Sequence, residues 1–155
     1  MIELEVMEEF ATRLRKRMEE KLPKDFNTSE LVEITVKSLG GRIIGADSPE
    51  YNAIFGMLKI YDKRNFVVKL SLYSSPIRDN FEVAVQVGRY IMSYDEDDLP
   101  ERVRTVMANR FAAALLMPRD LFLKVKNRYM GNIQSMAAHL QIPTEFVEER
   151  MRYCY

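Results

Sequence analysis

The sequence is poor in the residues that most often carry chemistry. It has one cysteine, Cys154, one histidine, His139, and no tryptophan among 155 residues. A single cysteine leaves no partner for an internal disulfide, which favours a cytoplasmic setting. Lys and Arg together number 23, as do Asp and Glu, so the formal net charge is zero. Bulk charge therefore does not favour nucleic acid as a partner.

Long apolar runs are also missing. No stretch approaches the roughly 18 consecutive apolar residues of a membrane-spanning helix, and the first residues lack the basic-then-apolar pattern of a secretory signal. We therefore expect no membrane association. The composition, 47% hydrophobic and 30% charged, is that of an ordinary globular domain.

The scarce residue types limit the active sites that are possible. Catalytic zinc takes three protein ligands from His, Cys, Asp or Glu, and a nucleophilic cysteine needs a histidine partner. Neither His139 nor Cys154 has such a setting in the sequence. No nucleophile elbow, Walker loop or dinucleotide fingerprint occurs. The acidic run 94–98 lacks the ligand spacing of a calcium loop and is interpreted as a solvated loop.

Two helices and a strand are predicted in the first part of the chain. Apolar residues recur at helical spacing over residues 2–22. A second helix is predicted from Thr28 to Leu39, where Asn27 caps it and Glu30 completes a capping box. Gly40-Gly41 ends this helix, and the β-branched residues at 42–44 predict a short strand.

A β-hairpin follows. The runs 53–61 and 65–73 alternate apolar and other residues, and Asp62-Lys63-Arg64 separates them. With the strand at 42–44 they form a small sheet of three strands. The sequence therefore predicts an α+β domain.

The rest of the chain is predicted to be helical. Ser75 caps a helix whose first residue is Pro76. Gly88 inside this helix costs about 1 kcal/mol relative to alanine, which indicates close packing there. The predicted helices cover residues 76–92, 101–116, 119–128, 133–140 and 144–153.

The last two helices resemble a helix-turn-helix pair in length. A DNA-reading second helix is basic, whereas this one sets Glu145, Glu148 and Glu149 against Arg150 and Arg152. Direct nucleic-acid binding is therefore not expected, and the pair is interpreted as a packed helical tail.

Two stretches carry a resemblance to a known family. Residues 75–89 match the pattern Ser-Pro-x-Arg-x-x-Phe-x-x-Ala-His-Glu-x-Gly-His at its framework positions, and residues 108–118 read Ala-Asn-Arg-Phe-Ala-Ala-Ala-Leu-Leu-Met-Pro. Leu39-Gly40-Gly41 and the segment 136–143 add to the match. The chain resembles the ImmA/IrrE family of metallopeptidases. This resemblance implies a zincin-like domain over residues 1–117, with a small sheet packed on helices, and a helical C-terminal subdomain over residues 118–155.

The departures from the family pattern fall on its chemical positions. Val85 and Arg89 stand at the two histidine ligands, Gln86 at the general base, Met107 at the glutamate ligand and Ser93 at a further histidine. Valine has no donor atom, and arginine keeps its positive charge. The resemblance therefore implies a pseudoenzyme without metal or other cofactor.

The resemblance also suggests a partner. Family members act on helix-turn-helix repressors or regulators, often in phages and mobile elements. We expect a protein that binds such a regulator without cleaving it, through a former catalytic cleft that contains Val85, Gln86, Arg89 and Met107. Two alternatives stay open: these residues only fill the old metal position, or the chain is a residual metallo-endopeptidase with a non-standard metal site acting on a repressor.

Overall fold

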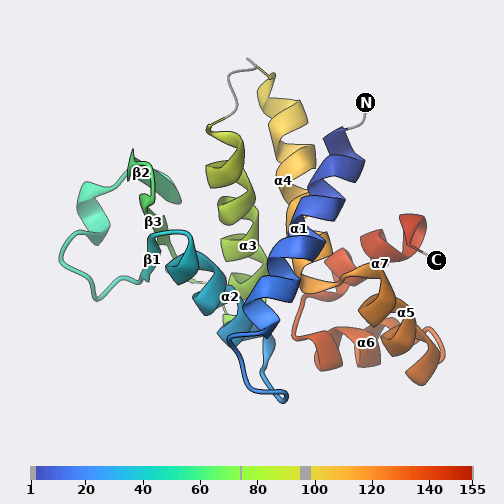
Figure 1. Ribbon diagram of the computed structural model, residues 1–155. Helices are drawn as coiled ribbons and strands as arrows, with labels where there is room; N and C mark the ends of the chain where they lie inside the picture. Colours follow the sequence, from blue (N-terminus) through green and yellow to red (C-terminus); the bar gives the residue numbers. More distant parts are fainter. Residues whose placement is uncertain (1–2, 74, 95–98, 155) are drawn as a thin grey trace.

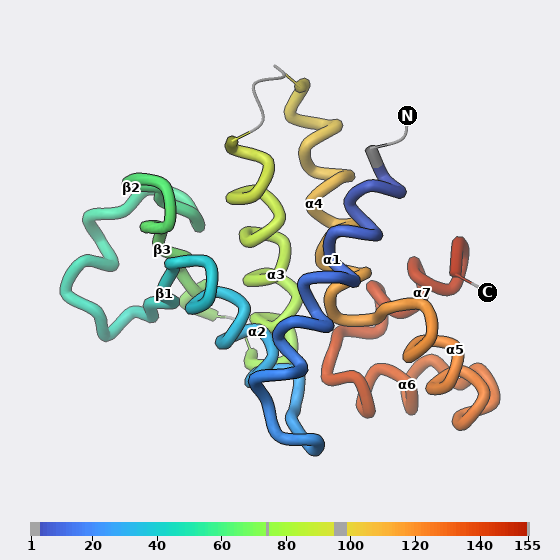
Figure 2. The backbone as a smooth tube through the Cα atoms, in the orientation of Figure 1, coloured from blue at the N-terminus to red at the C-terminus, as the bar shows by residue number. Residues whose placement is uncertain are grey.

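The computed structural model describes residues 3–73, 75–94 and 99–154 (Figures 1 and 2). Within these ranges the chain forms seven α-helices, one short 3₁₀ helix and three strands. The helices are α1 (Glu3–Glu19), α2 (Thr28–Ser38), η1 (Tyr51–Ala53), α3 (Pro76–Met92), α4 (Glu101–Leu116), α5 (Arg119–Arg128), α6 (Ile133–Leu140) and α7 (Thr144–Tyr153).

The strands form one small mixed sheet. They are β1 (Gly41–Ile44), β2 (Leu58–Asp62) and β3 (Asn65–Lys69), in the order β1-β3-β2. The central strand β3 runs parallel to β1 and antiparallel to β2. In this sheet β2 is therefore an edge strand. Figure 1 shows the sheet on one side of the molecule and the long helices beside it.

The core lies where α3 and α1 pack on α4. These two pairs make the most extensive contacts in the molecule. At Gly88 the helices approach so closely that a Cβ atom would lie 3.1 Å from Cδ1 of Phe111 and 3.2 Å from Cα of Ala108. The close packing predicted from this glycine is confirmed.

Helices α5 to α7 are fixed to the rest of the chain by specific contacts. The ring of Phe146 stacks on that of Phe81, with 3.7 Å between the centroids. The hydroxyl of Thr28 donates to Leu140 O at 2.7 Å, and the amide of Asn80 donates to Gln141 O at 3.1 Å. The described part of the tail thus packs against the starts of α2 and α3.

Most of the predicted elements are confirmed. The α+β class is correct, and the five helices from α3 onward have the predicted bounds. The capping box at Asn27 and Glu30 is present. The first helix ends at Glu19, earlier than expected, and the acidic residues 95–98 lie outside the described ranges.

The hairpin prediction was wrong at the start of its first strand and at the end of its second, which stops at Lys69 and not at residue 73. The first strand begins at Leu58 and not at Ala53, which lies in η1. Phe55, one of the alternating apolar residues of the predicted first strand, is 93% exposed. The cause is tertiary packing. The segment that carries η1 packs Tyr51 and Ile54 against Ile44 and Val67 on the outer face of the sheet.

None of the described helices has the length and the apolar character needed to span a membrane.

Candidate functional site

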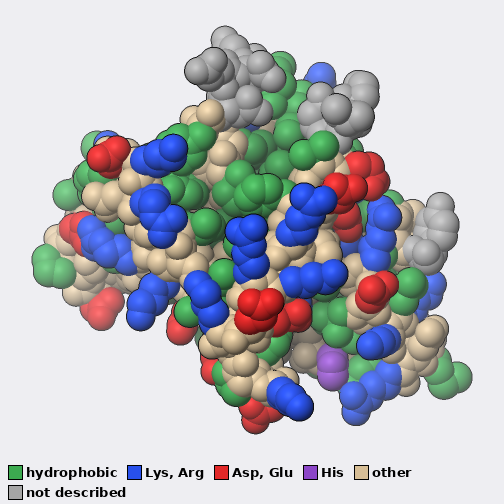
Figure 3. All heavy atoms as spheres, in the orientation of Figure 1, with side chains coloured by type: hydrophobic (Ala, Val, Ile, Leu, Met, Phe, Trp, Pro, Cys, Tyr) green, Lys and Arg blue, Asp and Glu red, His purple; other side chains and the backbone are tan. Residues whose placement is uncertain are grey.

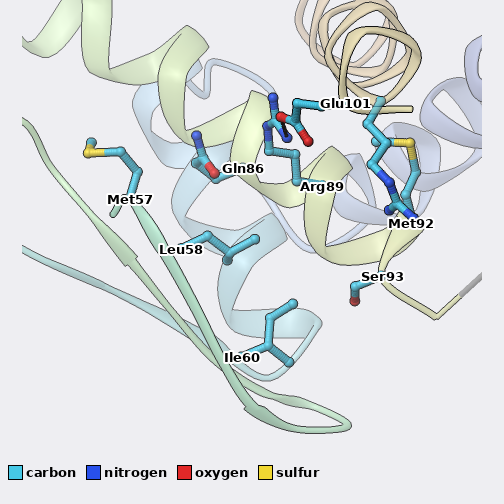
Figure 4. Close-up of a pocket in the computed structure, with 9 residues that line it drawn as sticks. Met57, Leu58, Ile60, Gln86, Arg89, Met92, Ser93 and Glu101 are labelled. Carbon is cyan, nitrogen blue, oxygen red and sulfur yellow. Dashed lines mark hydrogen bonds and ion pairs between the residues drawn. The ribbon is translucent and has the colours of Figure 1, made fainter. Parts of the chain in front are cut away.

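The candidate site is a pocket between β2, α3 and the start of α4 (Figure 4). Its volume is about 630 Å³. The lining residues come from the β2 edge, from one side of α3 and from the first turns of α4; they are Met57, Leu58, Ile60, Gln86, Arg89, Met92, Ser93, Glu101 and Arg104.

The β2 wall combines apolar side chains with an open backbone edge. Side chains alternate along a strand, so Leu58 and Ile60 face the pocket together. The N–H of Lys69 donates to Met57 O at 2.8 Å. This bond identifies Met57 and Lys59 as the positions whose backbone groups face β3. The backbone groups of Leu58 and Ile60 therefore point to the free edge.

The opposite wall carries a fixed cation. The guanidinium of Arg89, on α3, donates from Nη1 to Glu101 Oε1 and from Nη2 to Thr105 Oγ1, both at 2.8 Å. Figure 4 shows the Arg89 side chain directed toward Glu101 of α4. Because an unpaired buried guanidinium costs several kcal/mol, the sequence leads us to expect a carboxylate or several carbonyls beside Arg89, with the acidic run at 95–98 as the nearest candidate. A carboxylate is present, that of Glu101, whereas residues 95–98 lie outside the described ranges.

The four positions singled out by the sequence lie in two different settings. Gln86 and Arg89 line the pocket. Val85 and Met107 are only 8% and 6% exposed, belong to the central core, and are not among the residues that line it. The structure therefore does not join the four side chains in one pocket floor, and contact between them and a partner stays a prediction.

The residues at this place do not fit a zinc ion. Val85 offers no donor atom, and the permanent charge of Arg89 repels a cation. Across residues 3–73, 75–94 and 99–154, no three His, Cys, Asp or Glu side chains are grouped so that they can hold a metal.

The single histidine and the single cysteine lie away from the pocket. His139 is at the surface of α6 (Figure 3), where its Nδ1 is 3.1 Å from the hydroxyl of Tyr129. Cys154 is buried, and this burial raises the pKa of its thiol. Neither residue contributes to the candidate site.

Sequence reasoning missed pocket residues such as Leu58, Ile60 and Glu101, and also Thr105, which contacts Arg89 but does not line the pocket. Glu101 and Thr105 face Arg89 only because α3 and α4 pack side by side, and Leu58 and Ile60 line the pocket only because β2 is the edge strand. Arg89 itself was the one local signal for the Glu101 contact, because a buried guanidinium needs an acidic partner.

A three-stranded mixed sheet with a pocket between its edge strand and a helix pair is the architecture of a small zincin-like domain. The family model described as the IrrE N-terminal-like domain, Peptidase_M78, matches residues 55–152, and the chain belongs to this family. The match begins after Leu39-Gly40-Gly41 and continues across the boundary proposed at residue 117. A search of curated proteins and a search of solved structures found no match.

Proposed function

We propose that this chain is a non-catalytic member of its family that binds a helix-turn-helix transcriptional regulator in the cytoplasm without cleaving it. We also propose that a phage or mobile element encodes it. The observation that carries the proposal is Arg89. Arg89 stands at the position where the family pattern has a histidine ligand, and its guanidinium is held there by Glu101 and Thr105. Gln86 beside it has an amide, which cannot serve as a general base.

The pocket has the features of a peptide-binding groove. The free backbone edge of Leu58 and Ile60 supports the addition of a further strand. Their apolar side chains, with Met57, offer contact to a hydrophobic side chain of the partner. Gln86 adds polar groups on the facing helix. An extended segment of the regulator therefore binds along β2. The resemblance to a family that acts on helix-turn-helix regulators suggests which kind of protein supplies this segment.

The proposal is tested with any helix-turn-helix protein that proves to be encoded next to this gene. The two proteins are co-expressed and purified together, the dissociation constant is measured by calorimetry, and the mass of the regulator is determined before and after incubation. We expect a complex and an intact regulator.

Two variants of β2 locate the binding site. Ile60→Asp places a charge on the pocket side, and Tyr61→Asp places the same charge at an exposed residue next to it. We expect Ile60→Asp to weaken binding about 30-fold, the effect of a hot-spot residue, and Tyr61→Asp to leave it unchanged. Thermal unfolding of both variants checks that the fold is kept.

The other outcomes decide against the proposal. A shortened regulator, together with about one bound metal ion per chain by elemental analysis, would establish a residual metallo-endopeptidase. Equal binding by the two β2 variants would place the partner on another surface. If no complex forms, the neighbouring regulator is excluded as the partner.

A further inference from the structure

Arg89 forms a link between two helices and is more than a surface charge. Its two acceptors, Glu101 and Thr105, stand one turn apart on α4, and the Thr105 hydroxyl in turn donates to Glu101 O at 3.0 Å. The Arg89 side chain is 27% exposed, whereas that of Glu101 is 73% exposed. A largely covered cation is therefore fixed between α3 and the first turns of α4.

The start of α4 lacks another common means of fixation. Its N-cap residue is Pro100, and within the described residues no side chain caps the helix by a hydrogen bond. Helices α2 and α3, by contrast, begin with the side-chain caps Asn27 and Ser75. The hydrogen bonds of Arg89 are thus side-chain contacts that hold this end of α4 to α3.

The register of α4 determines which residue faces the cation. Successive residues turn by about 100° around a helix, so Thr105 and Met107 lie about 160° apart. Thr105 contacts Arg89, and Met107 lies in the core. The α4 residue that faces Arg89 is therefore Thr105, whereas the family pattern puts Met107 at the position of the glutamate ligand.

We propose that the Arg89 guanidinium is a built-in cation that joins α3 to α4 in place of the metal ion implied by the family pattern, with Thr105 as the α4 residue facing it. A metal needs donor atoms on both helices. Here no metal joins the helices. The Arg89 side chain of α3 supplies the positive charge and the N–H groups that donate hydrogen bonds, and α4 supplies the two oxygen atoms that accept them. Arginine suits this role because its planar fork reaches both acceptors at once and stays charged.

The first test removes the link. Arg89→Met keeps the apolar stem but loses the charge, and Arg89→Lys keeps the charge but loses the fork. We expect both variants to lower Tm by about 3 °C or more and to speed amide hydrogen exchange at residues 101–105. Arg78→Met is the matched control. Arg78 lies on α3, as Arg89 does, and pairs with Glu145 of α7, and both of these side chains are about half exposed.

Local exchange separates a specific link from a general loss of stability. The proposal requires faster exchange at the start of α4 in both Arg89 variants but not in Arg78→Met. Unchanged Tm and unchanged exchange in Arg89→Met would overturn it. Full rescue by Arg89→Lys would overturn the role of the two-acceptor fork.

The second test replaces the cation with a metal. One variant combines Val85→His, Arg89→His and Thr105→Glu, and its matched control carries Met107→Glu instead of Thr105→Glu. Zinc binding is measured by competition with a chromophoric chelator and by the zinc-dependent rise in Tm. We expect about one zinc ion per chain in the first variant and none in the second.

The register assignment is wrong if the Met107→Glu combination binds zinc and the Thr105→Glu combination does not. If both fold, as judged by circular dichroism, and neither binds zinc, the Arg89 position does not correspond to the metal position. If either fails to fold, Arg89→Met decides the proposal alone. None of these measurements needs a partner protein, so they are independent of the proposed regulator.

Discussion

At the residue scale, Gly40 is a position where the backbone leaves no room for a side chain. Its φ is +94°, and a Cβ atom would lie 2.2 Å from the carbonyl oxygen of Arg64. We predict that Gly40→Ala destabilises the fold by about 3 kcal/mol, since both the conformation and the clash oppose it. Gly45→Ala is the control, where the nearest atom is the Asp47 carboxylate at 3.2 Å. Urea unfolding measures both; equal stability of the two variants would contradict the packing at the α2–β1 junction.

Cys154 gives a second prediction at this scale. The side chain is 1% exposed, and burial raises the pKa of the thiol. At pH 8 the native protein therefore holds less of the reactive thiolate, and a reagent also has little access to it. We expect a chromogenic disulfide reagent to label the native protein more than about tenfold slower than the urea-unfolded protein. Equal rates would show that the end of α7 opens readily.

At the scale of single elements, the capping box of α2 is a local device with a measurable effect. The side chain of Asn27 accepts from Glu30 N–H at 2.8 Å, and the Glu30 carboxylate accepts from Asn27 N–H at 3.1 Å. We predict that Asn27→Ala lowers the free energy of unfolding by about 1 kcal/mol, and that Asn27→Ser retains most of it. Thermal unfolding of both variants tests this; an equal loss would mean that the cap oxygen is not what stabilises the helix.

The helices were predictable because their boundaries are encoded locally. Ser75-Pro76, Pro100, Pro118 and Pro143 each mark a helix start within two residues of the place where the structure has it. The start of β2 was not predictable, because residues before Leu58 pack on the far side of the sheet through Tyr51 and Ile54.

The candidate site was predictable only in part. The sequence pointed to Gln86 and Arg89, and both line the pocket. The sequence did not reveal that Glu101 and Thr105 hold Arg89, since that contact depends on how α4 is rotated against α3. A motif gives the order of residues, whereas the pocket depends on which side of each helix is turned inward.

At the scale of the whole molecule, one buried ion pair joins the first helix to the last. Arg150 of α7 is fully buried, and its guanidinium binds both carboxylate oxygens of Glu8 on α1 and also Met117 O. Arg119 and Arg110 lie farther from the same carboxylate, at 3.7 and 3.9 Å. The pair thus holds α1, the end of α4 and α7 together.

We predict that Arg150→Met destabilises the protein by about 3–5 kcal/mol, because it leaves Glu8 buried without its main partner. The double variant Glu8→Leu with Arg150→Met should be less destabilised than the sum of the single changes. Arg119→Met, at a half-exposed side chain, serves as the control and should cost less than about 1 kcal/mol. Additive effects in a denaturant-based double-mutant cycle would show that the two buried groups are not coupled.

The Glu8–Arg150 contact also determines when folding is completed during synthesis. The two residues are 142 positions apart, and a ribosome makes the chain from α1 toward α7 at about 5–20 residues per second. For several seconds the carboxylate of Glu8 is present without its guanidinium, while the apolar side of α1 already needs cover. The nascent chain therefore reaches its final packing only when α7 has emerged, and the preceding interval is the period in which chaperones or proteases meet an incompletely packed helix bundle.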